Sequence, residues 1–356
     1  MPSAPSVHTA PFGTTPKGEK ATLYTLANAH GITVSITDYG ALIASILTPD
    51  REGHFENIAL GFDSIEAYFT PEYRSENPHF GASIGRFANR IGGGKFKLEG
   101  VTYDLPKNDG PHCLHGGSEG FDTRVWKAEI LESKTPSVRF SLHSPDGDQG
   151  FPGAMDVSVT YALSDENELT MDFEAVSDKK TIVNFTNHTY YNLAGAGNGT
   201  ILDHELTLPA VHYTPVDDKL IPTGEFKKVE GTPLDFRKPH TLGSRINEVG
   251  GDPLGYDHNY VLADDVGFQL NGEVYDPKSG RVLGIYSDQP GVQLYTSNFL
   301  TGKLVGKDGK AYVQHGGICL EPQHFPDSPN KPQFPSVVLG AGETYRTRIA
   351  ARFGVR

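Results

Sequence analysis

Glu321 has a sequence environment that suits a general base. It follows three apolar residues, 318–320, and precedes Pro322, which predicts a carboxylate at the end of a buried strand. Loss of hydration there raises the pKa of a carboxyl group towards the range in which it can remove a proton from a substrate. The same alternation places Cys319 on the face of Glu321, where we expect the thiol to pack beneath a pocket. On this segment alone, a glutamate that pairs with an arginine at the end of a sheet explains the pattern equally well.

Polar side chains alternate along residues 184–193. If this segment is a β-strand, Asn184, Thr186, His188 and Tyr190 share one face, because successive side chains of a strand point to opposite sides. A buried polar face needs partners for all of its groups, so it either forms an internal network or lines a wet cavity. A lone histidine is more often structural, but this run of four polar positions favours a pocket.

Three further residues are weaker candidates when each is considered by itself. His115 precedes two glycines, whose missing side chains let a ligand approach the backbone closely, although His-Gly-Gly is more often a simple turn. Asp257 stands among aromatic and turn residues, and Gln293 alternates with apolar neighbours, so both are open to a structural explanation.

Two familiar kinds of site lack their sequence patterns. The glycine-rich residues 85–95 contain no Gly-x-x-x-x-Gly-Lys-Ser/Thr motif and no helical pattern follows them, which argues against a phosphate-binding loop. His-Glu-x-x-His and Cys-x-x-Cys are also absent, and His112 and His115 have no third ligand nearby in sequence. We therefore expect no metal site.

Short strands dominate the elements that must position these residues. The 41 glycines and 25 prolines interrupt the chain at short intervals, and stretches with a 3.6-residue period are few. Residues 21–26 and 32–37 alternate around a turn and predict a β-hairpin. Only residues 64–69 favour a helix. Similar alternation marks other predicted strands at 95–98, 138–142, 155–161, 169–175 and 345–353.

This pattern predicts an all-β fold consisting of one large antiparallel sandwich. We expect residues 21–356 to form a single β-sandwich catalytic domain, preceded by an extended N-terminal arm, residues 1–20, that is mobile or lies on a sheet edge. The alternative is two β-domains divided near residues 146–150, although that cluster is equally typical of a hairpin loop.

Composition and charge narrow the choice of partners. The formal net charge of -13 argues against nucleic acid or an anionic membrane surface as the main partner. No apolar stretch approaches the ~20 residues of a membrane span, and the N-terminus lacks a signal-peptide pattern. We expect Cys113 and Cys319 to be free thiols, and the protein to be cytoplasmic.

Five motifs together resemble the aldose 1-epimerase (galactose mutarotase) family and occur in the family order. The resemblance covers essentially the whole chain beyond the N-terminal arm, and five motifs with consistent spacing are far more specific than any one of them. The motifs are residues 85–91, 114–117, 187–193, 256–258 and 320–323.

The resemblance implies a large antiparallel β-supersandwich without a cofactor. It also implies an enzyme that interconverts the α and β anomers of free aldohexoses such as D-glucose and D-galactose. Carried over by position, Glu321 is similar to the general base and His188 to the general acid. We expect a monosaccharide substrate and a monomer or weak dimer. The residues similar to substrate-binding positions are Asn89, Arg90, His115, Asp257 and Gln293, with Tyr190 a weaker candidate.

The chemistry of this reaction agrees with that division of roles. To open a pyranose ring, a base must take the proton of the anomeric hydroxyl while an acid protonates the ring oxygen. His188 must then carry a proton at neutral pH, and we expect a nearby carboxylate, Asp257 or Glu321, to hold its pKa up.

Two alternatives remain at this point. A glycoside hydrolase would use Asp257 and Glu321 as a carboxylate pair on either side of a glycosidic bond. A non-catalytic sugar-binding protein would need exposed aromatic side chains for stacking, whereas the single Trp126 lies in a sequence typical of core or hairpin packing.

Overall fold

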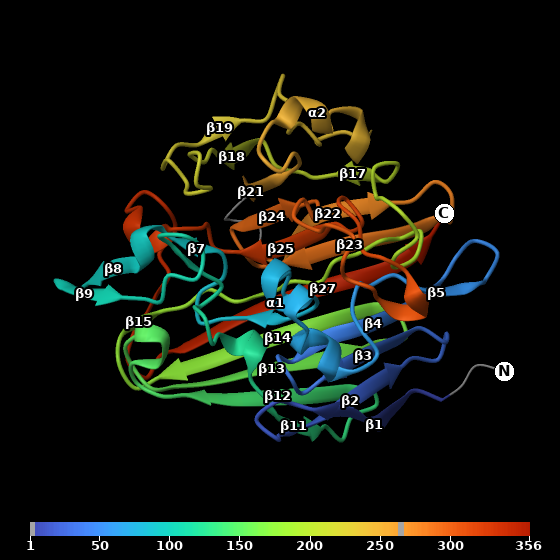
Figure 1. Ribbon diagram of the computed structural model, residues 1–356, viewed down its shortest axis with the longest axis horizontal. Helices are drawn as coiled ribbons and strands as arrows, with labels where there is room; N and C mark the ends of the chain where they lie inside the picture. Colours follow the sequence, from blue (N-terminus) through green and yellow to red (C-terminus); the bar gives the residue numbers. More distant parts are fainter. Residues whose placement is uncertain (1–3, 263–266) are drawn as a thin grey trace.

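The computed structural model describes residues 4–262 and 267–356, and antiparallel sheets make up most of it (Figure 1). This confirms the predicted all-β supersandwich. The largest sheet has nine strands and runs through the whole molecule. In spatial order these are β11 (Lys127–Ile130), β12 (Ser137–Ser144), β13 (Met155–Leu163), β14 (Glu168–Ser177), β27 (Thr344–Val355), β23 (Arg281–Ser287), β22 (Gln269–Tyr275), β17 (Glu205–Thr207) and β20 (His240–Thr241).

Two five-stranded sheets pack with this large sheet. The first, coloured blue in Figure 1, contains β1 (Ser6–Thr14), β2 (Lys20–Ala27), β3 (Thr33–Thr37), β4 (Leu42–Pro49) and β5 (Phe55–Asn57). The second contains, in spatial order, β19 (Lys227–Lys228), β18 (His212–Thr214), β21 (Asp257–Val261), β24 (Gly291–Tyr295) and β25 (Cys319–Gln323).

The remaining elements are short. Four strand pairs are β7 (Arg90–Ile91) with β10 (Cys113–Leu114), β8 (Lys95–Leu98) with β9 (Val101–Asp104), β6 (Ser83–Ile84) with β16 (Thr186–Asn187), and β15 (Thr181–Ile182) with β26 (Val338–Leu339). The α-helices are α1 (Pro71–Glu76) and α2 (Ile246–Val249). The 3-10 helices are η1 (Ile65–Phe69), η2 (Gly92–Gly94), η3 (Phe121–Thr123), η4 (Asp148–Gly150), η5 (Leu242–Ser244), η6 (Lys307–Gly309) and η7 (Ser328–Asn330). Within the described ranges, no helix is both long and apolar enough to span a membrane.

Alternation along the long strands builds the core. Every second side chain of β13 and β14 is buried, and the intervening ones are at least partly exposed. Because these strands pair with Val159 opposite Phe173, their apolar faces form one continuous surface. Trp126 is 2% exposed and packs in the same core, which confirms its interpretation as a packing residue.

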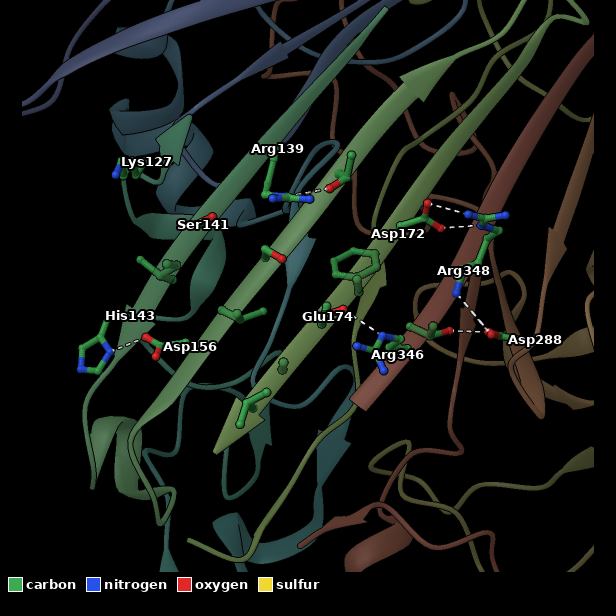
Figure 2. Close-up of a pocket in the computed structure, with 18 residues that line it drawn as sticks. Lys127, Arg139, Ser141, His143, Asp156, Asp172, Glu174, Asp288, Arg346 and Arg348 are labelled. Carbon is green, nitrogen blue, oxygen red and sulfur yellow. Dashed lines mark hydrogen bonds and ion pairs between the residues drawn. The ribbon is translucent and has the colours of Figure 1, made fainter. Parts of the chain in front are cut away.

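The outer face of β12, β13, β14 and β27 is hollowed, with a volume of about 990 Å³ (Figure 2). Its charged side chains pair across neighbouring strands: Arg348 Nε lies 2.5 Å from Asp172 Oδ1, and Arg346 Nε lies 2.8 Å from Glu174 Oε2. Exposed ion pairs of this kind add little net stability. The hollow is therefore the polar, solvent-facing side of a curved sheet.

Several local predictions can be compared with the structure. The predicted hairpin is confirmed, because β2 and β3 are antiparallel with Leu23 opposite Thr37. The short helical segment is η1, and α1 follows it. β1 pairs with β2 at the edge of its sheet. Residues 146–150 lie in the loop that joins β12 and β13, whose ends pair with Ser144 opposite Met155.

Strand register brings the candidate residues together. In the ladder of β21, β24 and β25, Gln293 is opposite Glu321, and Asp257 is opposite Tyr295. The segment around β16 lies beside this ladder, because Tyr191 forms a bridge with Ile318 just before β25 begins. The sheet edge and this segment thus form two walls of one site.

Candidate active site

Glu321 and His188 meet although they are far apart in sequence. Nε2 of His188 lies 3.5 Å from Oε2 of Glu321, and both side chains are almost completely buried. His188 directly follows β16, whereas Glu321 is the central residue of β25. The prediction that Glu321 ends its strand is therefore wrong. β25 is the edge strand of its sheet, where Pro322 is tolerated because its missing N–H costs no ladder hydrogen bond.

Burial makes Glu321 a strong proton acceptor. Desolvation, with a further contribution from Asp257, raises its pKa well above the ordinary value, and the positive charge of Arg90 opposes the shift only in part. Its Oε2 atom has no hydrogen-bond partner among the described residues. An unpartnered, buried carboxyl oxygen that faces a cavity is ready to accept a proton from a ligand.

His188 has a lowered pKa, which contradicts the expectation that a carboxylate holds it up. Burial and then nearby His79 lower the pKa of His188 from 6.5 to about 3, against a smaller opposing effect of a backbone hydrogen bond. The physical reason is that burial disfavours the charged form of each group, which lowers the pKa of the imidazole and raises that of the carboxyl group. Transfer of a proton from the carboxyl group to His188 would create a carboxylate beside an imidazolium.

His115 is held so that it can donate a hydrogen bond to a ligand. The backbone N–H of Asn89 donates to Nδ1 of His115 over 3.1 Å, which places the proton of the neutral ring on Nε2. Burial and nearby positive groups keep this ring neutral by lowering its pKa well below 6.5. His115, His188 and Glu321 each offer one ligand-type atom, and these atoms lie within 4.8 Å of one another. A metal on Nε2 would need the proton on Nδ1, facing the Asn89 N–H, so the geometry suits a sugar oxygen better than a metal.

Arg90 and Asp257 form a charged wall of the cavity, and hydrogen bonds with neighbouring side chains hold both in place. Arg90 Nε donates to Asp109 over 2.7 Å, and its Nη1 lies 4.0 Å from Asp257 Oδ2. Gln293 Nε2 donates to Asp257 Oδ1 over 2.6 Å, and Gln293 Oε1 accepts from Nε2 of Gln323 over 3.3 Å. Gln293 therefore lies behind Asp257 and is not among the residues that line the cavity.

These side chains line a cavity of about 760 Å³, a volume typical of small-molecule sites. The ring of Tyr190 stacks on His188 with centroids 5.1 Å apart and planes at 19°. Cys319 lies below the cavity, as expected, with its Sγ atom 3.7 Å from Nδ1 of His188. The predicted site residues that line the cavity are Asn89, Arg90, His115, His188, Tyr190, Asp257 and Glu321.

Sequence reasoning missed two cavity residues in particular. Nδ1–H of His79 donates to Oδ2 of Asp122 over 2.9 Å, and the His79 ring centroid lies 4.8 Å from that of His115. Its neighbourhood in sequence has no pattern that marks a site. Tyr295 lies 5.9 Å from Tyr190 between ring centroids. Tyr295 lies two residues after Gln293, so both side chains share one face of the strand, and this alternation could have identified Tyr295 from the sequence.

Residues 81–85 fit the Gly-x-Ser-x-Gly pattern of serine hydrolases, but the geometry does not. The Ser83 hydroxyl is buried. It donates a hydrogen bond to the Ala41 carbonyl over 3.2 Å and forms a second hydrogen bond with the Tyr161 hydroxyl over 2.8 Å. Neither partner is a base that could activate a serine. Ser83 is a packing residue.

Comparison with known proteins shows the family of this chain. The family model described as aldose 1-epimerase matches residues 22–352. The galactose mutarotase of Homo sapiens is 43% identical over 350 residues, which cover 98% of this chain and 99% of that protein. The aldose 1-epimerase of Escherichia coli K12 is 36% identical over 343 residues, covering 95% and 96%.

Superposition on solved structures shows the same fold. A GalM/aldose epimerase homologue from C. elegans superposes with a TM-score of 0.84 at 32% identity, covering 94% of this chain and 98% of that one. A galactose 1-epimerase from Lactobacillus acidophilus superposes with a TM-score of 0.83 at 28% identity, covering 99% of each chain. The chain belongs to the aldose 1-epimerase family, and it is an isomerase that interconverts the anomers of aldoses.

Proposed function

We propose that Glu321 is the general base and His188 the general acid for the interconversion of the α and β anomers of free aldohexoses such as D-glucose and D-galactose. The observation that carries this proposal is the 3.5 Å separation of Glu321 Oε2 and His188 Nε2 inside a cavity of about 760 Å³. A base and an acid at this spacing reach the anomeric hydroxyl and the adjacent ring oxygen of one pyranose.

The reaction begins from the charged form of the pair. The Glu321 carboxylate takes the proton of the anomeric hydroxyl while the His188 imidazolium protonates the ring oxygen. The bond between the anomeric carbon and the ring oxygen breaks, and an aldehyde forms. The aldehyde group rotates by roughly half a turn, and the reverse proton transfers close the other anomer.

The proton transfers of this cycle are linked to the electrostatics of the site. Ring opening leaves Glu321 protonated and His188 neutral, which is the state that burial favours in the cavity. On ring closure Glu321 returns its proton to the aldehyde oxygen, and His188 takes back the proton of the hydroxyl group that closes the ring, so each turnover ends in the state from which it began. Positioned proton transfers of this type are each worth about 10²–10⁴-fold in rate.

The surrounding groups hold the sugar. Arg90 and the Nε2–H of His115 donate to sugar oxygens on which negative charge develops, and such charge-assisted bonds are stronger than neutral ones. Asp257, held by Gln293, accepts a hydrogen bond from a hydroxyl group. Asn89 contributes through its backbone N–H, which sets the His115 tautomer, and Tyr190 packs against the acid.

We propose further that residues 21–356 act as one catalytic domain, as a monomer or weak dimer in the cytoplasm. Cys113 and Cys319 are both free and buried, which supports a reducing compartment. The acidic chain, with a formal net charge of -13, supports a partner other than nucleic acid.

A glycoside hydrolase fits the site less well. Asp257 is occupied by Gln293 and faces Arg90 at 4.0 Å, which suits an acceptor for a hydroxyl group rather than a proton donor to a leaving group. The test is to dissolve crystalline α-D-glucose or α-D-galactose and follow optical rotation. We expect faster approach to anomeric equilibrium with the protein, and no release of reducing sugar from methyl or aryl glycosides. An unchanged rate with both sugars would reject the proposal.

A further inference from the structure

Cys319 contacts the catalytic imidazole from the side opposite Glu321. Its Sγ atom lies 3.7 Å from Nδ1 of His188, while Nε2 of the same ring faces the carboxyl group at 3.5 Å. Cys319 is completely buried and does not line the cavity. It precedes Glu321 by two residues on β25, so both side chains project from one face of the strand.

The position of one proton on His188 decides whether the proposed cycle works. After the imidazolium has given its Nε2 proton to the ring oxygen, the neutral ring carries its proton on Nδ1. Nε2 is then free to take the proton back when the ring closes. The other neutral tautomer, with the proton on Nε2, cannot accept a proton from the sugar or from Glu321 at that atom.

The nature of the group at Nδ1 therefore matters. A thiol is a weak hydrogen-bond acceptor and a weak donor. Burial, together with Glu321 and Asp257, raises the pKa of Cys319 well above its ordinary value, so the sulfur carries no negative charge. An uncharged sulfur can accept the Nδ1–H bond, yet it stabilises the imidazolium far less than a carboxylate would.

We propose that Cys319 is a positioning residue whose sulfur accepts the Nδ1–H of His188, directs Nε2 towards Glu321 and the sugar, and leaves the imidazolium a strong acid. This inference rests on the proposed role of His188 as the general acid. Among the described residues, the side chain that forms a hydrogen bond with Nδ1 of His188 is Cys319, and a backbone hydrogen bond of His188 itself also acts on the ring. Tyr190 stacks on the face of the imidazole, and the His79 and His115 rings lie 6.1 and 5.1 Å away between centroids.

The test compares Cys319→Ala and Cys319→Ser with Cys113→Ala. Cys113 is a matched control, because it is the other buried, free cysteine and packs in a separate apolar cluster. Two readouts are needed: the 15N chemical shifts of the His188 ring nitrogens at neutral pH, and kcat and KM by polarimetry.

In the wild-type protein we expect a neutral His188 ring with its proton on Nδ1. In Cys319→Ala we expect a mixture of tautomers and a kcat about five- to tenfold lower, the effect of losing one weak hydrogen bond, with KM within about twofold. Cys319→Ser supplies a hydroxyl acceptor and should restore the tautomer and most of kcat. Cys113→Ala should match wild type in both readouts.

Two results would overturn the inference: a wild-type ring protonated on Nε2, or a Cys319→Ala variant with wild-type tautomer and kcat. The NMR readout does not depend on turnover. A wild-type protein that shows the expected tautomer but does not accelerate mutarotation would therefore reject the proposed function and leave the Nδ1 contact established.

Discussion

Gln293 donates a hydrogen bond from Nε2 to Oδ1 of Asp257 over 2.6 Å, and only Asp257 of this pair lines the cavity. The two residues lie on adjacent strands, β24 and β21, and Gln293 is also opposite Glu321 in the ladder of β24 and β25. The amide of Gln293 therefore fixes the carboxylate of Asp257, which faces the cavity, while Gln293 itself remains behind that carboxylate. If Gln293 acts through Asp257 in this way, substitution of Gln293 should affect activity only when Asp257 is present.

The first prediction concerns this pair. Asp257→Ala should raise KM for D-galactose, because a hydrogen-bond acceptor for a sugar hydroxyl is lost, and Gln293→Ala should raise KM less. In the double variant the two effects should not add, with a coupling of about 0.5–3 kcal/mol. Polarimetric rates over a range of sugar concentrations measure all four proteins. Strictly additive effects would show that Gln293 acts independently of Asp257.

The second prediction tests the base. Glu321→Gln keeps the side-chain volume but cannot accept the anomeric proton, so kcat should fall by at least about 10²-fold, the usual worth of positioned general base catalysis. Circular dichroism should show an unchanged fold. Glu174→Gln is the control, because Glu174 lies on the outer face of the large sheet in a pair with Arg346. A Glu321→Gln variant as active as wild type would show that the base is misassigned.

The third prediction separates the acid from the binding residues. His188→Asn should lose turnover by a similar factor while sugar affinity changes little, since its task is proton transfer. Arg90→Ala should weaken affinity more strongly, because a charged donor to sugar oxygens disappears. Affinity is measured by calorimetry with D-galactose, independently of turnover. Equal losses of affinity in both variants would contradict this division of roles.

The fourth prediction follows from the raised pKa of Glu321. In the unfolded chain this carboxyl group loses its proton near pH 4.5, whereas in the folded protein it keeps it to higher pH. The unfolded state is therefore favoured progressively as pH rises above about 4.5. Glu321→Gln removes this titration, so the free energy of unfolding of the variant should rise relative to wild type as pH increases above about 4.5. Urea unfolding at several pH values measures the difference, and a constant difference would contradict burial of the carboxyl group.

The lowered pKa of His188 changes stability with pH in the opposite direction to the raised pKa of Glu321. The unfolded ring binds a proton below its ordinary pKa of 6.5, whereas the folded ring binds one only near pH 3. Its contribution to stability is thus present above pH 6.5 and is lost as pH falls towards 3. The same urea series applied to His188→Asn should show the variant gaining stability relative to wild type across this range. A parallel pH dependence of the two proteins would mean that the ring is protonated in the folded state.

The sequence alone predicted the strands and singled out the groups that we propose to react. Apolar alternation at residues 155–161 and 169–175 predicted β13 and β14 because the side-chain period of a strand is two and one face must be buried. His188 and Glu321 were singled out by polar or ionisable side chains among apolar neighbours, and the resemblance to a family assigned their roles. Local pattern carries this information because it depends only on residues adjacent in the chain.

Only the tertiary structure decided the proton affinity and the tautomer of these groups. The shared polar face of residues 184–193 depended on the segment being one strand, yet only Thr186–Asn187 pairs as β16, and the rest of the segment takes partners from several other parts of the chain. The low pKa of His188 comes from burial and from His79, a residue that is distant in sequence and that no local pattern marked. Proton affinity and tautomer depend on desolvation and on neighbours in space, and both arise only when remote segments pack together.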